Sequence, residues 1–299
     1  MSKLSAKLLQ NQRVITAEIT PPKGAGIKKL SRHAELLKPY VDAINITDCQ
    51  RALVKMSSLA ACRVLLDNDV EPVYQLTCRD RNGIALQSDL MGAQALGIPN
   101  VLCLTGDPVK VGDYTCAKSV FEVEAVGLLN LVGRLQGGKD ASGNKMNAPT
   151  KFFVGAVVNP TVQALTGQLQ RMQKKIDAGA RFFQTQANYD LDDYYRFLTA
   201  SRSLQTKVIA GVLILHSYEV AKYIHENIPG IRLPSILLDR FQSASHPEQV
   251  GIDFAVETML KIESVSEGFH LMTVREEELI PKVLEAYHAR QSSGQKIAR

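Results

Sequence analysis

The sequence predicts a single-domain α/β protein of the (β/α)8 barrel, or TIM barrel, class. Apolar runs of strand length alternate with helical patterns along the 299 residues, which is typical of a parallel sheet. The runs are apolar at nearly every position, as at residues 152–158, which is expected when both faces of a strand are buried. About eight such units favour closure into a barrel.

The individual elements follow from hydrophobic periodicity and from turn signals. We expect strands near residues 13–19, 41–46, 71–77, 100–104, 152–158, 181–185, 207–213 and 268–272. Helices are expected near 28–38, 54–68, 84–96, 120–136, 161–178, 190–203, 217–227, 246–264 and 276–290, with an extra turn near 237–241. Gly97 and Gly179 follow helical patterns, as terminating glycines do, and Asp190 or Asp192 can cap the helix that follows.

Three segments lie outside this alternation, and the whole of residues 1–299 is expected to form one barrel domain. Residues 1–12 predict a short amphipathic helix that covers one end of the barrel. Residues 136–150 are rich in Gly, Asn, Lys and Asp and predict a solvated loop. Residues 291–299 are polar and basic, and we expect a frayed tail there.

Composition narrows the class of function. The net charge of +5 is modest and the basic residues are scattered, which argues against nucleic-acid binding and fits anionic small molecules better. The chain has no apolar run of membrane-spanning length. Five cysteines without a C-x-x-C pair, with Cys62, Cys78 and Cys103 in apolar patterns, indicate reduced thiols in a cytoplasmic protein. The six histidines have no ligand spacing, so no metal site is expected.

Polar groups at the ends of the expected strands predict an active site at one mouth of the barrel. Glu18 is placed to act as a general acid or to form a salt bridge on the rim. Asp107 follows Thr105 and Gly106, where Gly106 would let a ligand approach the backbone. The alternative for Asp107 is a simple turn, since Asp and Pro both favour turns.

Further polar side chains extend this rim. Gln184 and Gln186 lie two residues apart on one face of a strand end, and one of them is expected to reach the mouth, where an amide can recognise a heterocycle or bind loop backbone. Lys174 and Lys175 either offset a helix dipole or bind a phosphate. The remaining polar groups at strand ends are Thr47, Gln75, Thr77, Asn159 and Thr273.

Six short segments carry a family resemblance when they are taken together and in order. They are residues 17–22 (Ala-Glu-Ile-Thr-Pro-Pro), 44–48, 75–78, 104–107, 175–180 with 185–186, and 272–275. Together they resemble the methylenetetrahydrofolate reductase family over about residues 13–290. Residues 78–82 and 158–160 are similar to the short reductases of bacterial acetyl-CoA pathways.

The resemblance implies a flavin-bearing barrel that reduces 5,10-methylenetetrahydrofolate to 5-methyltetrahydrofolate by a ping-pong route. It implies FAD, with FMN as the alternative, and electrons from NAD(P)H or from a partner subunit that carries iron–sulfur clusters. By matching position, Glu18 would be the acid, Asp107 would hold the pterin and stabilise an iminium ion, and Gln186 would recognise the pterin edge. Phe241 and Arg275 would also contact the substrate. The flavin-side positions are Thr47, Gln75, Thr105, Gly106, Asn159, Arg171, Lys174 and Lys175.

The sequence departs from the family at several flavin-side positions. Gln75 stands where the better-known bacterial enzymes have His, Thr105 stands in place of Arg, and Arg171 replaces a smaller polar residue. Residues 157–160 lack the Tyr and His of those enzymes. The alternatives are therefore a flavin-free reductase and a catalytic subunit that works only with an electron-delivering partner. A lyase or methyltransferase on a similar barrel, and assembly as a homo-oligomer, also stay open.

Overall fold

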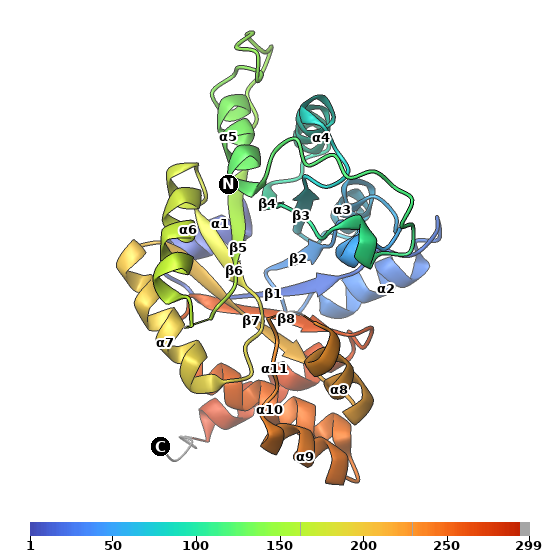
Figure 1. Ribbon diagram of the computed structural model, residues 1–299, viewed down its shortest axis with the longest axis vertical. Helices are drawn as coiled ribbons and strands as arrows, with labels where there is room; N and C mark the ends of the chain where they lie inside the picture. The colour runs from blue at the N-terminus through green and yellow to red at the C-terminus, as the bar shows by residue number, and fades with distance from the viewer. Residues whose placement is uncertain (162, 229, 294–299) are drawn as a thin grey trace.

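The computed structural model describes residues 1–161, 163–228 and 230–293, which fold as a closed barrel of eight parallel strands (Figure 1). Neighbouring strands pair in chain order, and the last strand pairs with the first. The predicted fold class is confirmed, and each strand lies within two residues of its expected bounds. The strands are β1 (Val14–Ile19), β2 (Ala43–Ile46), β3 (Pro72–Thr77), β4 (Asn100–Leu104), β5 (Phe153–Val158), β6 (Phe182–Thr185), β7 (Lys207–Ile214) and β8 (Gly268–Thr273).

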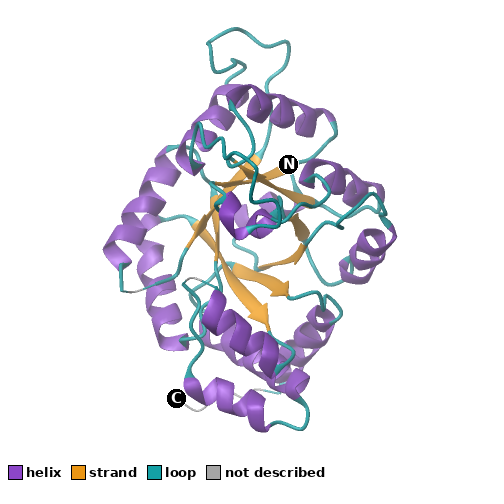
Figure 2. Cartoon of the chain, turned by 45° about the vertical axis from the view of Figure 1, so that its right-hand side comes forward, coloured by secondary structure: helices purple, strands orange, loops and turns teal. Residues whose placement is uncertain are grey.

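Apart from α1 (Lys3–Leu9), the helices lie around the outside of the strands (Figure 2). They are α2 (Lys28–Leu37), α3 (Ser58–Asp67), α4 (Gly83–Ala95), α5 (Ala125–Gln136), α6 (Leu165–Asp177), α7 (Leu191–Ser201), α8 (Tyr218–Asn227), α9 (Ser235–Ser243), α10 (Pro247–Ile262) and α11 (Leu279–Ser292). Short 3-10 turns occur at Gln50–Ala52, Val109–Val111 and Arg202–Leu204. None of the helices described is long and apolar enough to cross a membrane.

Helix ends follow the expected signals with three corrections. Asp190, rather than Asp192, caps α7 by accepting a hydrogen bond from the Asp193 amide. The helices predicted from residues 54, 120, 161 and 276 begin only at Ser58, Ala125, Leu165 and Leu279, because turns or irregular backbone precede them. At the C-terminus α11 continues to Ser292, so fraying does not begin at residue 291, and residues 294–299 lie outside the described part of the chain.

An apolar floor closes the barrel at the N-terminal ends of its strands. Inward-facing side chains and two leucines of α1 form one buried cluster: Leu4, Leu8, Val14, Ala43, Val73, Leu102, Phe182 and Ile209. Gly155 leaves room for the Phe182 ring, since a Cβ there would lie 2.3 Å from it. The Glu71 carboxylate accepts hydrogen bonds from the amides of Lys3 and Leu4, which suits a negative charge at a helix N-terminus. The predicted helix that covers one barrel end is therefore present.

The insertion forms a loop as predicted, and the three cysteines that lie in apolar patterns are buried. Residues 137–150 form a mostly exposed loop that projects beyond α5, with a bridge between Lys139 and Lys145 (Figure 1). All five cysteines are free, and Cys62, Cys78 and Cys103 are buried. Burial raises the pKa of Cys78 to about 11, which leaves that thiol protonated and unreactive near neutral pH. With one end of the barrel filled by α1, the carboxyl ends of the strands remain as the place for a site.

Candidate active site

A polar layer lies inside the barrel above the apolar floor. Asn45 Nδ2 donates to Gln184 Oε1 (2.6 Å), and Gln184 Nε2 donates back to Asn45 Oδ1 (3.1 Å). Gln184 Nε2 also lies 3.2 Å from Thr16 Oγ1, which in turn is 2.9 Å from His270 Nδ1. These four side chains are buried and satisfy one another, as buried polar groups must. Of the two glutamines, Gln184 thus lies inside the barrel and Gln186 lies exposed at the end of β6.

Glu18 stands directly above this layer, at the carboxyl end of β1. Its side chain is 14% exposed, and its Oε2 accepts a hydrogen bond from Gln75 Nε2 at 2.9 Å. His270 Nε2 lies 3.6 Å from the same Oε2, so the imidazole stands between Glu18 and Thr16. Gln50 Nε2 approaches the other carboxylate oxygen at 3.5 Å. The arrangement supplies a carboxyl group open to the mouth and a titratable ring behind it.

Sequence reasoning missed three members of this polar group, namely Thr16, Asn45 and His270. The spacing of the histidines predicts no metal ligand, and His270 belongs to no other motif. The alternation of side chains along β8 could have indicated His270, because Gly268, His270 and Met272 share one face of the strand. In a closed barrel that face points into the lumen, where an imidazole needs a polar partner.

Thr47 lies at the end of β2, and its hydroxyl makes no hydrogen bond within the described part of the chain. The residue is fully buried. Leaving a buried hydroxyl unpaired costs about 1–3 kcal/mol. With no exposed surface, this hydroxyl is open to a ligand atom only if neighbouring side chains at the mouth move.

Asp48, the next residue, has a structural environment. Its Oδ2 accepts hydrogen bonds from the amide and hydroxyl of Thr77, at 2.9 and 2.8 Å, and from Arg81 Nη1 at 2.7 Å. Burial alone would lower the pKa of Arg81, but the Asp48 carboxylate outweighs it and the pKa lies above its ordinary value. Asp89 accepts from the other side of the same guanidinium group. Asp48 therefore ties β2 to the end of β3 instead of facing a ligand.

Asp107 holds the loop that follows β2. The residue is exposed, and its Oδ2 accepts a hydrogen bond from the Arg51 amide at 2.8 Å. In this loop Cys49, Arg51 and Ala52 all have left-handed φ, at 44°, 56° and 55°. Such backbone is costly for residues other than glycine and persists only where surrounding contacts fix it. The Asp107 carboxylate supplies one such contact at the mouth.

Gly106 is required by the chain's own packing. Its φ is +95°, and a Cβ there would lie 3.0 Å from the Thr77 Cβ and 3.1 Å from the Arg79 Cβ. The close approach to this glycine is thus made by the end of β3, whereas we expected a ligand to approach its backbone. The residue before it, Thr105, uses its hydroxyl to accept a hydrogen bond from the Ala125 amide (3.2 Å) at the start of α5.

Asn159 and Gln186 come together beneath the segment after α8. Gly230 there has a φ of +84°, and a Cβ on it would lie 3.1 Å from Asn159 Nδ2 and 3.9 Å from Gln186 Oε1. The two amides therefore lie close to one glycine at the ends of β5 and β6. Together they offer donors and acceptors to a heterocycle at this side of the mouth.

The remaining predicted residues are distributed around the barrel wall and its rim. Phe241 is 2% exposed and packs in the apolar cluster of α8, α9 and α10, which includes Leu215 and Leu237. Arg171 and Lys174 are exposed on α6. Arg275 has left-handed φ and lines a rim cavity beside α2.

Lys175 donates to the Val157 carbonyl at 2.7 Å, and burial followed by the nearby Arg171 charge lowers its pKa. Between the lowered pKa and the ordinary value near 10.5, the unfolded chain binds more protons than the folded chain, so the free energy of unfolding rises with pH. Lys175→Met should lose this dependence. Urea unfolding at several pH values up to about 10.5 should therefore favour the unchanged chain more as the pH approaches this ordinary value, and a constant difference over that range would contradict the assignment.

Comparison with known proteins decides the family. A model of the methylenetetrahydrofolate reductase family matches residues 3–288, from α1 to α11. The chain belongs to the methylenetetrahydrofolate reductase family. The resemblance seen in the sequence is thereby confirmed, over a slightly longer span toward the N-terminus.

Relatives that bear the family's name come from eukaryotes and bacteria. Methylenetetrahydrofolate reductase 1 of Schizosaccharomyces pombe is 22% identical over 303 residues, covering 95% of this chain and 48% of its own length. The 5,10-methylenetetrahydrofolate reductase of Salmonella typhimurium is 26% identical over 222 residues, which cover 70% of this chain and 68% of its own. This member of the family therefore spans between 34% and 48% of the length of the first eukaryotic relatives that it matches.

Among solved structures, an uncharacterized protein from Clostridium thermocellum has the same fold. Its TM-score is 0.65 at 16% identity, with 96% of this chain and 99% of that chain covered. That protein is described as binding two copies of 5-methyl-5,6,7,8-tetrahydrofolic acid. At this level of identity the likeness establishes the barrel shared by the two proteins.

Proposed function

We propose that this chain reduces 5,10-methylenetetrahydrofolate to 5-methyltetrahydrofolate with a bound flavin. The observation that carries the proposal is Glu18, a carboxyl group at the mouth of a barrel of this family, held by Gln75 and backed by His270. The names of the curated relatives and the methyltetrahydrofolate bound by the Clostridium thermocellum neighbour support it.

The substrate's chemistry explains why a carboxyl group is needed. The methylene carbon bridges two nitrogens and resists direct attack by hydride. A proton delivered by Glu18 to the outer nitrogen opens the ring to an electrophilic iminium ion, and the carbon then accepts a hydride to become the methyl group. The net change is one proton and one hydride added to the folate. Glu18 is left as a carboxylate, beside His270 Nε2 at 3.6 Å, which is placed to hold the next proton.

The residues at the mouth fit a flavin ring. The buried Thr47 hydroxyl lacks a partner among the described residues, which a carbonyl or nitrogen of the ring would satisfy. The exposed Gln186 amide, which offers both donor and acceptor groups, is left to recognise the pterin edge of the substrate. Arg171 and Lys174, exposed on α6, would bind the phosphate of FAD or FMN. A flavin held there would supply hydride transfer from the reductant to the folate, which suits a ping-pong route.

Asp107→Asn should weaken folate binding and slow the folate half-reaction by about 10-fold or more. The carboxylate would lose the charge that stabilises the cationic iminium ion, while the amide oxygen can still accept from the Arg51 amide. Rapid-mixing kinetics of cofactor reoxidation by the folate measure this. If only the unfolding temperature changes, Asp107 serves the loop and not the substrate.

One titration tests the function as a whole. Protein reconstituted with FAD or with FMN is mixed anaerobically with NADH and then with methylenetetrahydrofolate while absorption is followed. We expect flavin bands that bleach with NADH and return with the folate. Bands that bleach only with dithionite and still return with the folate would assign electron delivery to a partner subunit. No return with the folate under either reductant would overturn the proposal.

A further inference from the structure

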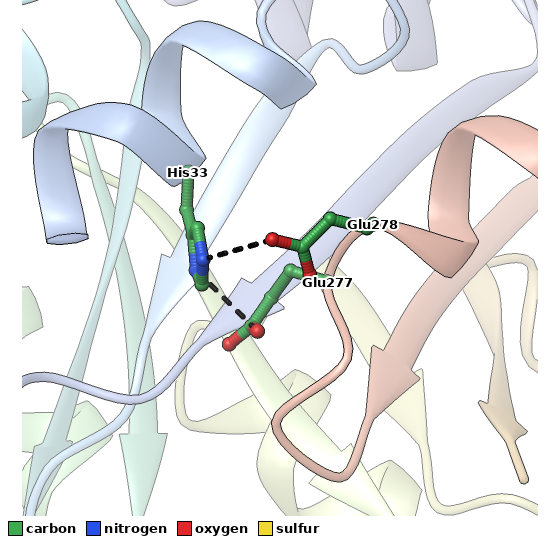
Figure 3. Close-up of side chains that lie close together, drawn as sticks. All are labelled: His33, Glu277 and Glu278. Carbon is green, nitrogen blue, oxygen red and sulfur yellow. Dashed lines mark ion pairs between the residues drawn. The ribbon is translucent and has the colours of Figure 1, made fainter. Parts of the chain in front are cut away.

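Two neighbouring glutamates meet a histidine from the opposite end of the chain at the rim of the barrel. His33 lies on α2, whereas Glu277 and Glu278 lie in the turn before α11 (Figure 3). Glu277 Oε2 lies 3.4 Å from His33 Nδ1, and Glu278 Oε1 lies 3.7 Å from His33 Nε2. One donor atom from each of the three residues falls within 4.8 Å of the others.

Glu277 is the residue that the surrounding structure leaves unsatisfied. Its side chain is 9% exposed, and its Oε2 has no hydrogen-bond partner in the described part of the chain. The 3.4 Å separation from His33 Nδ1 is longer than the roughly 2.7–2.9 Å of a charge-assisted hydrogen bond. A buried carboxylate without hydrogen bonds is expensive unless a cation compensates it. The oxygen points into the cluster, as Figure 3 shows.

We propose that His33, Glu277 and Glu278 bind a divalent transition-metal ion of the Zn²⁺ type. Imidazole nitrogen and carboxylate oxygen are common zinc ligands, at about 2.0–2.2 Å from the metal. Two ligands at this distance in a tetrahedron lie roughly 3.3 Å apart. The separation of 3.4 Å between Glu277 Oε2 and His33 Nδ1 matches one edge of such a site. Glu278, whose side chain is 42% exposed, can move to complete the set.

The charges of the cluster and of the cavity beside it indicate which further ligand a bound ion would take. Two carboxylates neutralise the ion, and three protein ligands leave one of the four positions open. The adjacent cavity, of about 580 Å³, is lined by His33 and Glu278 of the cluster, by Glu276, and by four basic residues, Lys28, Lys29, Arg32 and Arg275. Arg32 contacts Glu278 at 3.4 Å and competes with a metal, but its side chain is 73% exposed and can turn into solvent. The open position is thus suited to water or a small anion.

Metal binding to the untagged, chelator-treated full chain tests the proposal. Co²⁺ serves as the spectroscopic probe, and Zn²⁺ is used for calorimetry and thermal unfolding. We expect one Co²⁺ per chain with visible absorption bands of a nitrogen–oxygen site and no thiolate charge-transfer band. Zn²⁺ should then displace the Co²⁺ and raise the unfolding temperature, since a ligand that binds only the folded state stabilises it.

Three single variants separate a metal site from an ion-paired cluster. Glu277→Gln and Glu278→Gln should each weaken Co²⁺ binding by at least about 100-fold, the upper end of what loss of a supporting group costs a metal site. Glu276→Gln, at an exposed position in the same turn, is the matched control and should bind Co²⁺ as the unchanged chain does. Glu278→Gln keeps the test valid if the buried Glu277 variant fails to fold.

The opposite results would overturn the proposal. They are no stoichiometric Co²⁺ spectrum in the unchanged chain, or equal Co²⁺ affinity in Glu276→Gln and Glu278→Gln. Because the readouts are metal binding and unfolding, they do not depend on folate turnover. A failure of the metal site would therefore leave the proposed function standing.

Discussion

Replacing Glu18 by glutamine should lower methylenetetrahydrofolate turnover by at least about 100-fold. Glutamine keeps the shape of the side chain and can still meet Gln75, but it cannot deliver a proton to the folate nitrogen. Reduction of the bound flavin by NADH or dithionite needs no such acid and should keep its rate. Stopped-flow absorption separates the two half-reactions in one preparation.

A matched variant guards against a general effect of charge. Glu35→Gln removes a carboxylate from the exposed face of α2, the helix that follows β1, and should leave both half-reactions unchanged. If Glu18→Gln turns over folate within a few-fold of the unchanged chain, Glu18 is a rim carboxylate and not the acid. The proton would then have to come from another group at the mouth.

Asp48→Ala should destabilise the fold by about 3–5 kcal/mol, the usual cost of removing one partner from a buried ion pair. The change leaves the Arg81 guanidinium with Asp89 alone and removes the acceptor for the amide and the hydroxyl of Thr77. The free energy of unfolding from urea titration measures the effect.

The control for this prediction is an exposed ion pair. Asp67→Ala breaks the i,i+4 ion pair between Asp67 and Arg63 on α3. The Asp67 side chain is 57% exposed, so the change should lower the free energy of unfolding by no more than about 0.5 kcal/mol. A loss below about 1 kcal/mol in Asp48→Ala would mean that water replaces the lost contacts. In that case the network would not be what ties β2 to β3.

Glu18, Asp48 and Asp107 show how far sequence could resolve the candidate site. Each is a carboxylate at or just after the end of an apolar strand, and from the pattern alone they look equivalent. They differ in which face of the strand carries the side chain and in which residues surround it. Glu18 faces the lumen, Asp48 meets Arg81 outside it, and Asp107 holds the Arg51 amide. The strands were predictable because burial on both faces leaves a strong local signal, whereas partners from other strands leave none.

The rim cluster is a stronger example of the same limit. Metal-ligand motifs are recognised by short spacing, but His33 and Glu277 are joined only when the barrel closes and brings α2 beside the turn before α11. Lys175 is a second case. Its place late in a helix suggested a dipole or phosphate role, and only the packing of α6 on β5 reveals the Val157 carbonyl as its partner.

The helix that closes the floor of the barrel bears on the order in which the molecule assembles. Leu4 and Leu8 are made early in synthesis, yet the pocket that receives them needs side chains from β1 through β7, including Ile209. The first helix can therefore complete its docking only once β7 is in place. Until then we expect its leucines to stay exposed to water and to other chains, as is general for contacts that span a long stretch of sequence.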